Sequence, residues 1–137
     1  MEDYKKSYKG FIVLMAAFVI LLFLLSFITD VDADFITIII CNLTNIWMVL
    51  LTWIIYKTEK IYWYTGIAYE EAARTSSENR KRYAIRHFRR FAIYAVVFIL
   101  YSAFAFLCNI SLIVSIMIET IGIVAVAIST MNIKLIE

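Results

Sequence analysis

The chain has 137 residues, about the length of one domain, and 64% of them are hydrophobic. Soluble domains hold about 45–50% apolar residues, and so short a chain could not bury this excess in a water-soluble core. Thirteen Lys and Arg against eleven Asp and Glu give a net charge of +2. Two cysteines without metal-ligand spacing and a single histidine argue against a zinc or iron–sulfur site, so no metal or other cofactor is expected.

The apolar residues gather in four blocks, at residues 11–28, 35–56, 91–108 and 110–133. Each block has about 18 or more residues, enough at about 1.5 Å per residue to cross a hydrocarbon core of about 30 Å. We therefore predict an all-α polytopic membrane protein, a single domain of four transmembrane helices. The apolar stretch of the first block is longer than that of a signal peptide, which predicts an uncleaved anchor.

The basic residues predict the orientation. Lys5, Lys6 and Lys9 precede the first predicted helix, Lys134 follows the last, and every other Lys and Arg lies between residues 57 and 90. Cytoplasmic loops are enriched in Lys and Arg. We therefore expect both termini and the long loop on the cytoplasmic side of a plasma (inner) membrane.

The loop 57–90 is predicted to be helical. Ile61, Tyr64, Ala68 and Ala72 recur at helical spacing, and so do Ala84, Ile85, Phe88 and Phe91. The run from Thr75 to Glu78 is typical of a capping box that opens a helix, with Thr75 as the cap. We predict a cytoplasmic helical hairpin in which the second and third membrane helices continue and turn near residues 75–77.

One register of this hairpin matches both apolar and charged residues. It would bring Tyr64 near Phe88, and Glu70 and Glu71 near Lys81 and Arg82, so that acid faces base. The aromatic run of residues 62–64 would lie in an interfacial belt. The alternative is that the amphipathic segments lie flat on the inner leaflet.

Glu119 is a charged residue in the middle of a predicted span. It lies about nine residues, or roughly 13 Å, from the outer end of the last helix, and ionisable groups at such depth usually face the bundle interior or a cavity. Ser115 shares its helical stripe, while Asn42 and Asn45 form a polar stripe on the second helix at nearly the same depth. We predict an intramembrane polar site where Glu119 meets Asn45.

Three interpretations of this site stay open. A neutral Glu119 could be hydrogen-bonded to Asn45 and simply join two helices. It could instead bind a proton or a cation in a small transporter or channel. A Glu119 at a lipid-exposed or oligomer surface is the third interpretation.

Six basic residues cluster just before the third predicted span: Arg80, Lys81, Arg82, Arg86, Arg89 and Arg90. Topology setting and attraction to anionic lipid headgroups, about 1 kcal/mol per residue near the surface, explain such a cluster. A docking surface for a protein partner is the alternative. No nucleic-acid-binding motif accompanies the cluster, so nucleic acid is not an expected partner. His87, which lies among these residues, is predicted to be exposed.

The outer turn and the cysteines carry weaker signals. Asp30, Asp32 and Asp34 copy the opening of an EF-hand loop, but its sixth-position glycine and twelfth-position glutamate are missing. An outer turn that caps the second helix is therefore predicted, and weak binding of a divalent ion is the alternative. A disulfide between Cys41 and Cys108 would need Cα atoms within about 4.4–6.8 Å. Their predicted depths differ, which favours buried thiols acting as small apolar residues.

The stretch from Ala73 to Asn79, followed by Tyr83, resembles the cytoplasmic signature of SdpI-type small bacterial membrane proteins. In that family an Arg-Thr pair, here Arg74 and Thr75, and a short polar run precede a helix that returns to the membrane. The resemblance covers about fifteen residues, 73–87. It implies an immunity or signalling role against a peptide toxin.

Two function classes follow from the sequence, and neither is an enzyme. The first is an interaction or regulatory membrane protein, of immunity type if the resemblance holds, that acts through its basic hairpin. The second is a small proton- or cation-coupled transporter or channel subunit that uses Glu119. Because four helices are few for a transport path, the second class favours a homo-oligomer.

Overall fold

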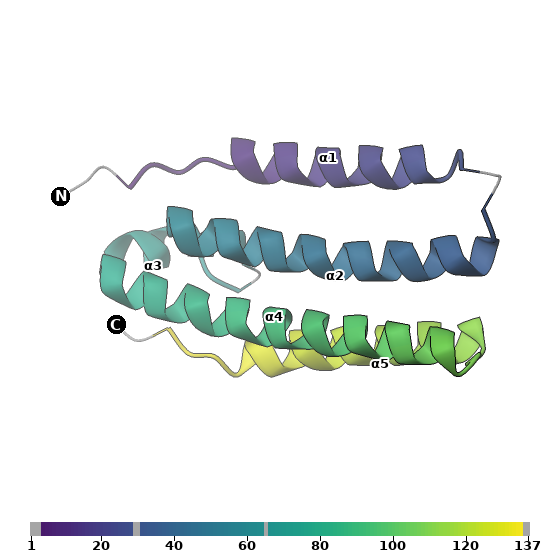
Figure 1. The fold of residues 1–137 in the computed structure, drawn as a ribbon. Coiled ribbons are helices and arrows are strands. Elements are labelled where there is room, and N and C mark those ends of the chain that lie inside the picture. The colour runs from purple at the N-terminus through teal and green to yellow at the C-terminus, as the bar shows by residue number, and fades with distance from the viewer. Residues whose placement is uncertain (1–3, 29–30, 65, 136–137) are drawn as a thin grey trace.

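The computed structural model describes residues 4–28, 31–64 and 66–135, and over these residues the fold is all-α. Its elements are α1 Lys9–Leu25, α2 Ala33–Thr58, the 3-10 turn η1 Ile61–Trp63, α3 Tyr69–Arg74, α4 Ser77–Leu107 and α5 Leu112–Met131. The four long helices lie side by side, each antiparallel to the one before it (Figure 1). The short elements η1 and α3 lie together at one end of this bundle.

Three helices are long and apolar enough to cross a membrane: α2, α4 and α5. At about 1.5 Å per residue, the 20 residues of α5 reach about 30 Å, the thickness of a hydrocarbon core. Helix α1 is apolar as well but has 17 residues. Three such helices suggest a multi-pass membrane protein.

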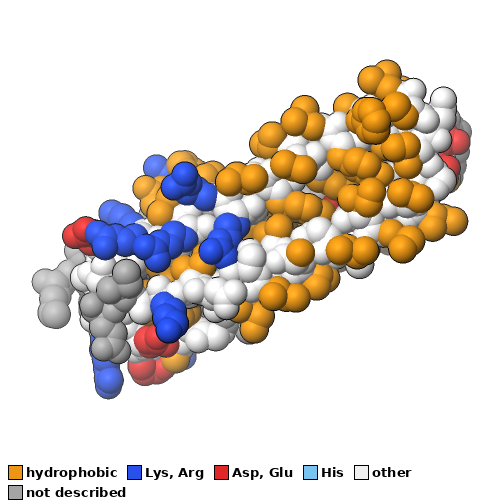
Figure 2. Space-filling model, turned by 90° about the horizontal axis from the view of Figure 1, so that it is seen from below, with side chains coloured by type: hydrophobic (Ala, Val, Ile, Leu, Met, Phe, Trp, Pro, Cys, Tyr) orange, Lys and Arg blue, Asp and Glu red, His pale blue; other side chains and the backbone are white. Residues whose placement is uncertain are grey.

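The bundle has the exposure pattern of a protein surrounded by lipid. Helix α1 buries no residue, and α5 buries only Ser115 and Glu119. The exposed side chains of the long helices are mostly aliphatic and aromatic, and they cover the length of the bundle in Figure 2. Water would select the opposite pattern, with polar side chains outside and apolar ones inside.

Helices α2 and α4 form the centre of the bundle. The buried residues of α4 recur three or four positions apart and form one stripe: Tyr83, Ala84, His87, Phe91, Ala95, Phe98, Ser102 and Ala105. Helix α4 packs against both α2 and α5, whereas α1 packs against α2. One contact of α1 is the stacking of Phe18 on Trp47, with ring centroids 5.2 Å apart.

A folded cap closes one end of the bundle. It consists of residues 4–8, 59–64, 66–76 and 132–135 together with the last turn of α2 and the first turns of α4. Lys and Arg side chains gather at this end, which we call the basic end (Figure 2). The opposite end, where α2 begins, carries Asp32 and Asp34. The core of the cap contains Ile55, Ile61, Tyr62, Ala72, Tyr83, Ala84 and Ile133, all buried.

The predicted continuation of the second membrane helix into this cap was wrong. Helix α2 ends at Thr58, because Glu59 takes the left-handed conformation with φ 57° and turns the chain. The chain then forms η1 and the short α3 instead of one long helix. The other arm agrees with the prediction, because α4 runs without a break from Ser77 to Leu107.

The capping residue of α4 and the register within the cap also differ from the prediction. Ser76, not Thr75, caps α4, and its hydroxyl accepts a bond from the Asn79 amide at 3.3 Å. Thr75 instead donates to the Glu71 carbonyl oxygen at 2.9 Å. The ring of Tyr64 stacks on His87, not on Phe88, at 4.3 Å between centroids.

The aromatic run of residues 62–64 packs in the core of the cap. Tyr62 is buried, and Trp63 and Tyr64 are half-buried against it. These rings have apolar bodies and polar tips, so a folded cap can use both.

Candidate functional site

The predicted contact between Glu119 and Asn45 is present. Asn45 Nδ2, from α2, donates to Glu119 Oε1 at 2.9 Å. Tyr94, from α4, donates to Glu119 Oε2 at 2.8 Å and lies 3.0 Å from the Glu119 carbonyl oxygen. Glu119 is 8% exposed and Asn45 2%. One buried carboxyl group thus links α5 to both central helices, and Tyr94 is the member that sequence reasoning missed.

Gly122 makes room for Tyr94. A Cβ atom at position 122 would lie 2.7 Å from Tyr94 Cζ and would also overlap the ring edge and the hydroxyl. The glycine lies one turn after Glu119 on α5, so the phenol reaches the carboxyl by crossing the bare backbone there. We call Glu119, Asn45, Tyr94 and Gly122 the polar site.

The other two residues predicted for this site form a neighbouring layer. Asn42 Nδ2 donates to Ser102 Oγ at 3.0 Å, joining α2 to α4. Ser115 Oγ lies 3.2 Å from the Tyr101 hydroxyl, joining α5 to α4. Neither Asn42 nor Ser115 is bonded to Glu119, so the prediction grouped two successive layers into one.

A pocket of about 480 Å³ opens next to this second layer. It lies between the first turns of α2, the last turns of α4 and the start of α5. Asn42, Ser102 and Ser115 line it, as do Asp32 and Asp34. The pocket therefore runs from the acidic end of the bundle to within one helical turn of Asn45 and Glu119.

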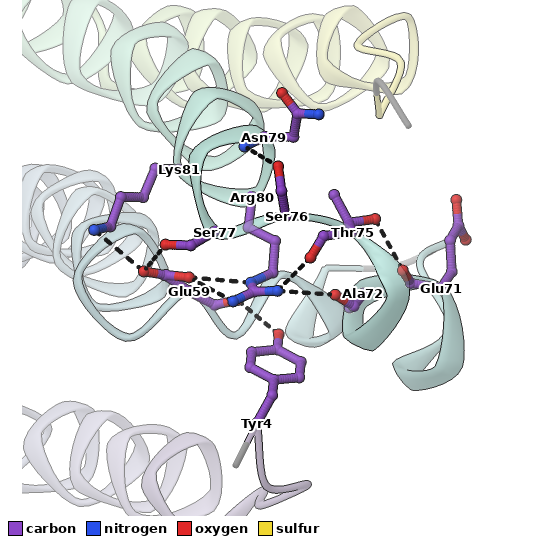
Figure 3. A network of polar contacts seen from close by, with 10 residues as sticks. All are labelled: Tyr4, Glu59, Glu71, Ala72, Thr75, Ser76, Ser77, Asn79, Arg80 and Lys81. Atoms are coloured by element: carbon purple, nitrogen blue, oxygen red, sulfur yellow. Dashed lines mark hydrogen bonds and ion pairs between the residues drawn. The ribbon is translucent and has the colours of Figure 1, made fainter. Parts of the chain in front are cut away.

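At the basic end, Arg80 and Glu59 organise the cap (Figure 3). Arg80 Nη2 and Nε both donate to Glu59 Oε2, at 2.8 and 3.1 Å, and these bonds are strengthened by the opposite charges of the two groups. Arg80 Nη1 also donates to the carbonyl oxygens of Ala72 and Thr75. The guanidinium carbon lies 4.2 Å from the centre of the Tyr4 ring. Arg80 thus binds α2's end, α3's end and the N-terminal arm at once.

Glu59 completes the network from the acidic side. Lys81 Nζ lies 3.2 Å from its Oε1, and Ser77 Oγ donates to the same oxygen at 2.7 Å (Figure 3). Burial alone would raise the pKa of Glu59, but the hydrogen bonds from Ser77, Arg80 and Lys81 outweigh burial and lower it. The predicted pairing of Glu70 and Glu71 with Lys81 and Arg82 was therefore wrong. Lys81 pairs with Glu59, and Arg82 pairs with Glu78 on its own helix.

The N-terminal arm is bonded into the cap. Tyr4 donates from its hydroxyl to the Glu59 carbonyl oxygen at 2.7 Å. The Ser7 amide donates to the Tyr62 hydroxyl at 2.9 Å, and Trp63 Nε1 donates to the Ser7 carbonyl oxygen at 3.1 Å. These bonds hold the chain before α1 against η1. The start of α1 and the end of α2 are thus fixed to the same end of the molecule.

The predicted basic cluster splits into inward and outward members. Arg80 and Arg90 are half-buried, and Arg90 donates to the Ser129 carbonyl oxygen of α5. Exposed members are Lys81, Arg82, Arg86 and Arg89, of which Arg82 donates from Nη2 to Glu78 Oε1 at 2.8 Å. Arg82, Arg86 and Arg89 lie four and three residues apart, so they share one outward stripe of α4. We call these three residues the arginine stripe.

The prediction for His87 was wrong. It was predicted to be exposed, but it is 4% exposed and lies between the rings of Tyr64 and Tyr83. Its Nδ1 lies 3.1 Å from the Tyr83 carbonyl oxygen. Position 87 belongs to the buried stripe of α4, so His87 faces the core although basic residues near it in the sequence are exposed.

The structure also describes part of the acidic turn and both cysteines. Asp32 caps α2, as predicted, because its Oδ1 accepts from the amides of Asp34 and Phe35 at 2.9 and 3.0 Å. Asp30 lies outside the described residues. Cys41 and Cys108 are free thiols, and Cys108 is exposed instead of buried. Within the described ranges, no group of three or more His, Cys, Asp or Glu side chains is placed to hold a metal ion.

Comparison with known proteins adds no further assignment. No protein-family model, no curated protein and no solved structure matches this chain.

Proposed function

We propose that this chain is a four-span protein of the plasma (inner) membrane, with both termini cytoplasmic, that acts as a non-enzymatic interaction or regulatory protein through its cap. We propose that the cap binds an acidic segment of a partner protein at the cytoplasmic face. The immunity role implied by the resemblance of residues 73–87 to SdpI-type proteins stays a prediction within this class.

The proposed fourth span is α1 with the residues that follow it. Amides of Ser26, Phe27 and Ile28 still bond to carbonyl oxygens of the last turn of α1, so helical turns continue to residue 28. Residues 9–28 would extend about 30 Å, against about 25 Å for the 17 residues of α1 itself. The bonded N-terminal arm supports the same topology, because it lies at the basic end that the positive-inside bias places in the cytoplasm.

The arginine stripe is the observation that carries the proposal. Arg82 and Arg89 are about 10 Å apart along α4, so the stripe runs along the bundle axis and away from the membrane. A layer of headgroups lying across the axis would reach only the nearer arginines. An acidic segment standing beside α4 could reach Arg86 and Arg89 directly, and Arg82 in competition with Glu78, whose exposed ion pair with Arg82 is weak. Guanidinium groups bind carboxylates with two parallel hydrogen bonds.

Binding of an acidic peptide tests this proposal. The full chain would be placed in phosphatidylcholine nanodiscs and titrated with a fluorescent polyglutamate peptide. We expect binding that weakens with salt and falls about tenfold when Arg82, Arg86 and Arg89 are replaced by Gln. Replacing Lys5, Lys6 and Lys9 by Gln removes the same charge at the same end and should leave most of the binding.

Two results would overturn the proposal. One is an equal loss of peptide binding in both variants, which would show that only the total positive charge of this end matters and not the position of the three arginines. The other is a chain that gathers anionic lipid around itself but does not bind the peptide. In that case the cluster would serve topology and lipid attraction alone.

A small proton- or cation-coupled transporter or channel subunit is the second candidate. The pocket that ends at Asn42 and Ser115, one turn from Asn45 and Glu119, favours it. Its test is proton flux into liposomes. Flux that Glu119→Gln abolishes would support the candidate, and a chain that conducts nothing would exclude it.

A further inference from the structure

The pocket at the acidic end of the bundle has the size and lining of a small-molecule site. Its volume of about 480 Å³ falls within the roughly 300–1,000 Å³ typical of ligand pockets. Its walls are apolar and come from three elements: Phe35 and Ile38 of α2, Phe106 of α4 and Leu112 of α5. The polar lining residues are Asp32, Asp34, Asn42, Ser102, Asn109 and Ser115. Apolar walls with a limited number of placed polar groups are typical of sites that bind an apolar body in a fixed orientation.

The rim of this pocket is negative. Asp32 and Asp34 line it, and both are exposed. Every Lys and Arg of the chain belongs to the segments at the other end of the bundle, so no basic side chain among the described residues lies beside the two carboxylates. The Asp32 side chain accepts amide hydrogens from the first turn of α2 through Oδ1 only.

The deep end is uncharged and polar. Asn42 lies about 15 Å along α2 from Asp32, and Ser115 is 1% exposed. Their bonds to Ser102 and Tyr101 hold them in place, so the floor is rigid and offers dipoles instead of charges.

These three features select one class of ligand. An inorganic cation would need several oxygen ligands in a shell, which the Ile, Leu and Phe walls do not supply. A neutral acyl chain would gain nothing from the carboxylates. We propose that this pocket binds a small organic cation, an ammonium group on an apolar body, with the ammonium at Asp32 and Asp34 and the apolar body between α2, α4 and α5.

Benzyltrimethylammonium and its neutral isostere neopentylbenzene test the charge requirement. Binding to the full chain in phosphatidylcholine nanodiscs would be measured by saturation-transfer NMR. We expect the cation to bind more tightly than the isostere. Replacing Asp32 and Asp34 by Asn should lower the affinity for the cation about tenfold, and Asn keeps the helix cap.

Two further variants separate the pocket from general effects. Glu70→Gln with Glu71→Gln removes two charges at the basic end and should leave binding unchanged. Ala103→Leu adds volume at an exposed position that lines the pocket and should weaken binding of both probes without loss of helix content.

The proposal is overturned if neither probe binds, if the isostere binds as tightly as the cation, or if the Asn variant keeps full affinity. Equal binding of the isostere would identify the pocket as a niche for lipid chains. These outcomes are independent of the polyglutamate titration, which concerns the opposite end of the molecule.

Discussion

Replacing Gly122 by Ala should break the bond between Tyr94 and Glu119. The new Cβ would lie 2.7 Å from Tyr94 Cζ, well inside van der Waals contact, so the ring must move away from α5. It would then give up its 2.8 Å bond to Glu119 Oε2 and leave Asn45 as the remaining donor that we identify to the carboxyl group.

The size of the effect follows from three contributions. Hydrogen bonds between membrane helices contribute about 0.6 kcal/mol on average and about 1.7 at most. Overpacking of a well-filled site costs about 1–3 kcal/mol. The better helix propensity of Ala offsets about 0.8–1 kcal/mol of this cost. We therefore expect Gly122→Ala to lower the free energy of unfolding by about 1–3 kcal/mol.

The assay is unfolding of the purified protein in mixed micelles with increasing SDS, followed by tryptophan fluorescence. Gly10→Ala is the matched control, because its Cβ would meet only the tip of the Trp63 ring, at 3.1 Å, and that tip can shift. In a Tyr94→Leu background the clash disappears, so Gly122→Ala should be neutral or stabilising there. A Gly122→Ala variant as stable as the parent, or a cost that persists in the Tyr94→Leu background, would refute the reasoning.

Three further predictions concern the cap and the acidic end. The pKa of Glu59 is lowered in the folded chain, so the stabilisation from ionised Glu59 is present above the ordinary carboxylate pKa and is lost as pH falls through the pKa of the folded state. Proteolysis of the cap should therefore rise in acid, and Glu59→Gln should remove this pH dependence. Arg80→Lys should raise amide hydrogen exchange in residues 4–8, because one ammonium cannot hold Glu59 and two carbonyl oxygens together, whereas Arg86→Lys should not. Asp32→Ala should cost about 1 kcal/mol in SDS unfolding through the lost cap, and Asp32→Asn only a fraction of that.

The contact between Asn45 and Glu119 could be predicted by counting residues from the end of each predicted helix. Asn45 and Glu119 lie at similar distances from the acidic end, and polar side chains in lipid seek one another. Tyr94 lies about one turn deeper, and its long side chain reaches back to the carboxyl group. That reach depends on Gly122 lying opposite, a coincidence of two helices that no single-helix pattern reveals.

The cap was predictable only in part, for a different reason. The start of α4 follows from local capping chemistry, so the sequence indicates it to within one residue. The end of α2 depends on Glu59 in a left-handed conformation, which costs a non-glycine residue about 1 kcal/mol or more. The bonds that offset this cost come from Arg80 and Lys81, which reach Glu59 only after the chain has folded.

Labelling of single cysteines in intact cells tests the four-span topology most directly. In a background with Ser at positions 41 and 108, Cys would replace Lys6, Val31, Glu70, Asn109 or Lys134, all exposed positions. With an impermeant maleimide we expect labelling at positions 31 and 109 in intact cells, and at positions 6, 70 and 134 only after permeabilisation. Labelling of positions 6 and 31 together in intact cells would show that α1 does not cross the membrane, and labelling of positions 6, 70 and 134 without 31 and 109 would show the opposite orientation; either result contradicts the proposed topology.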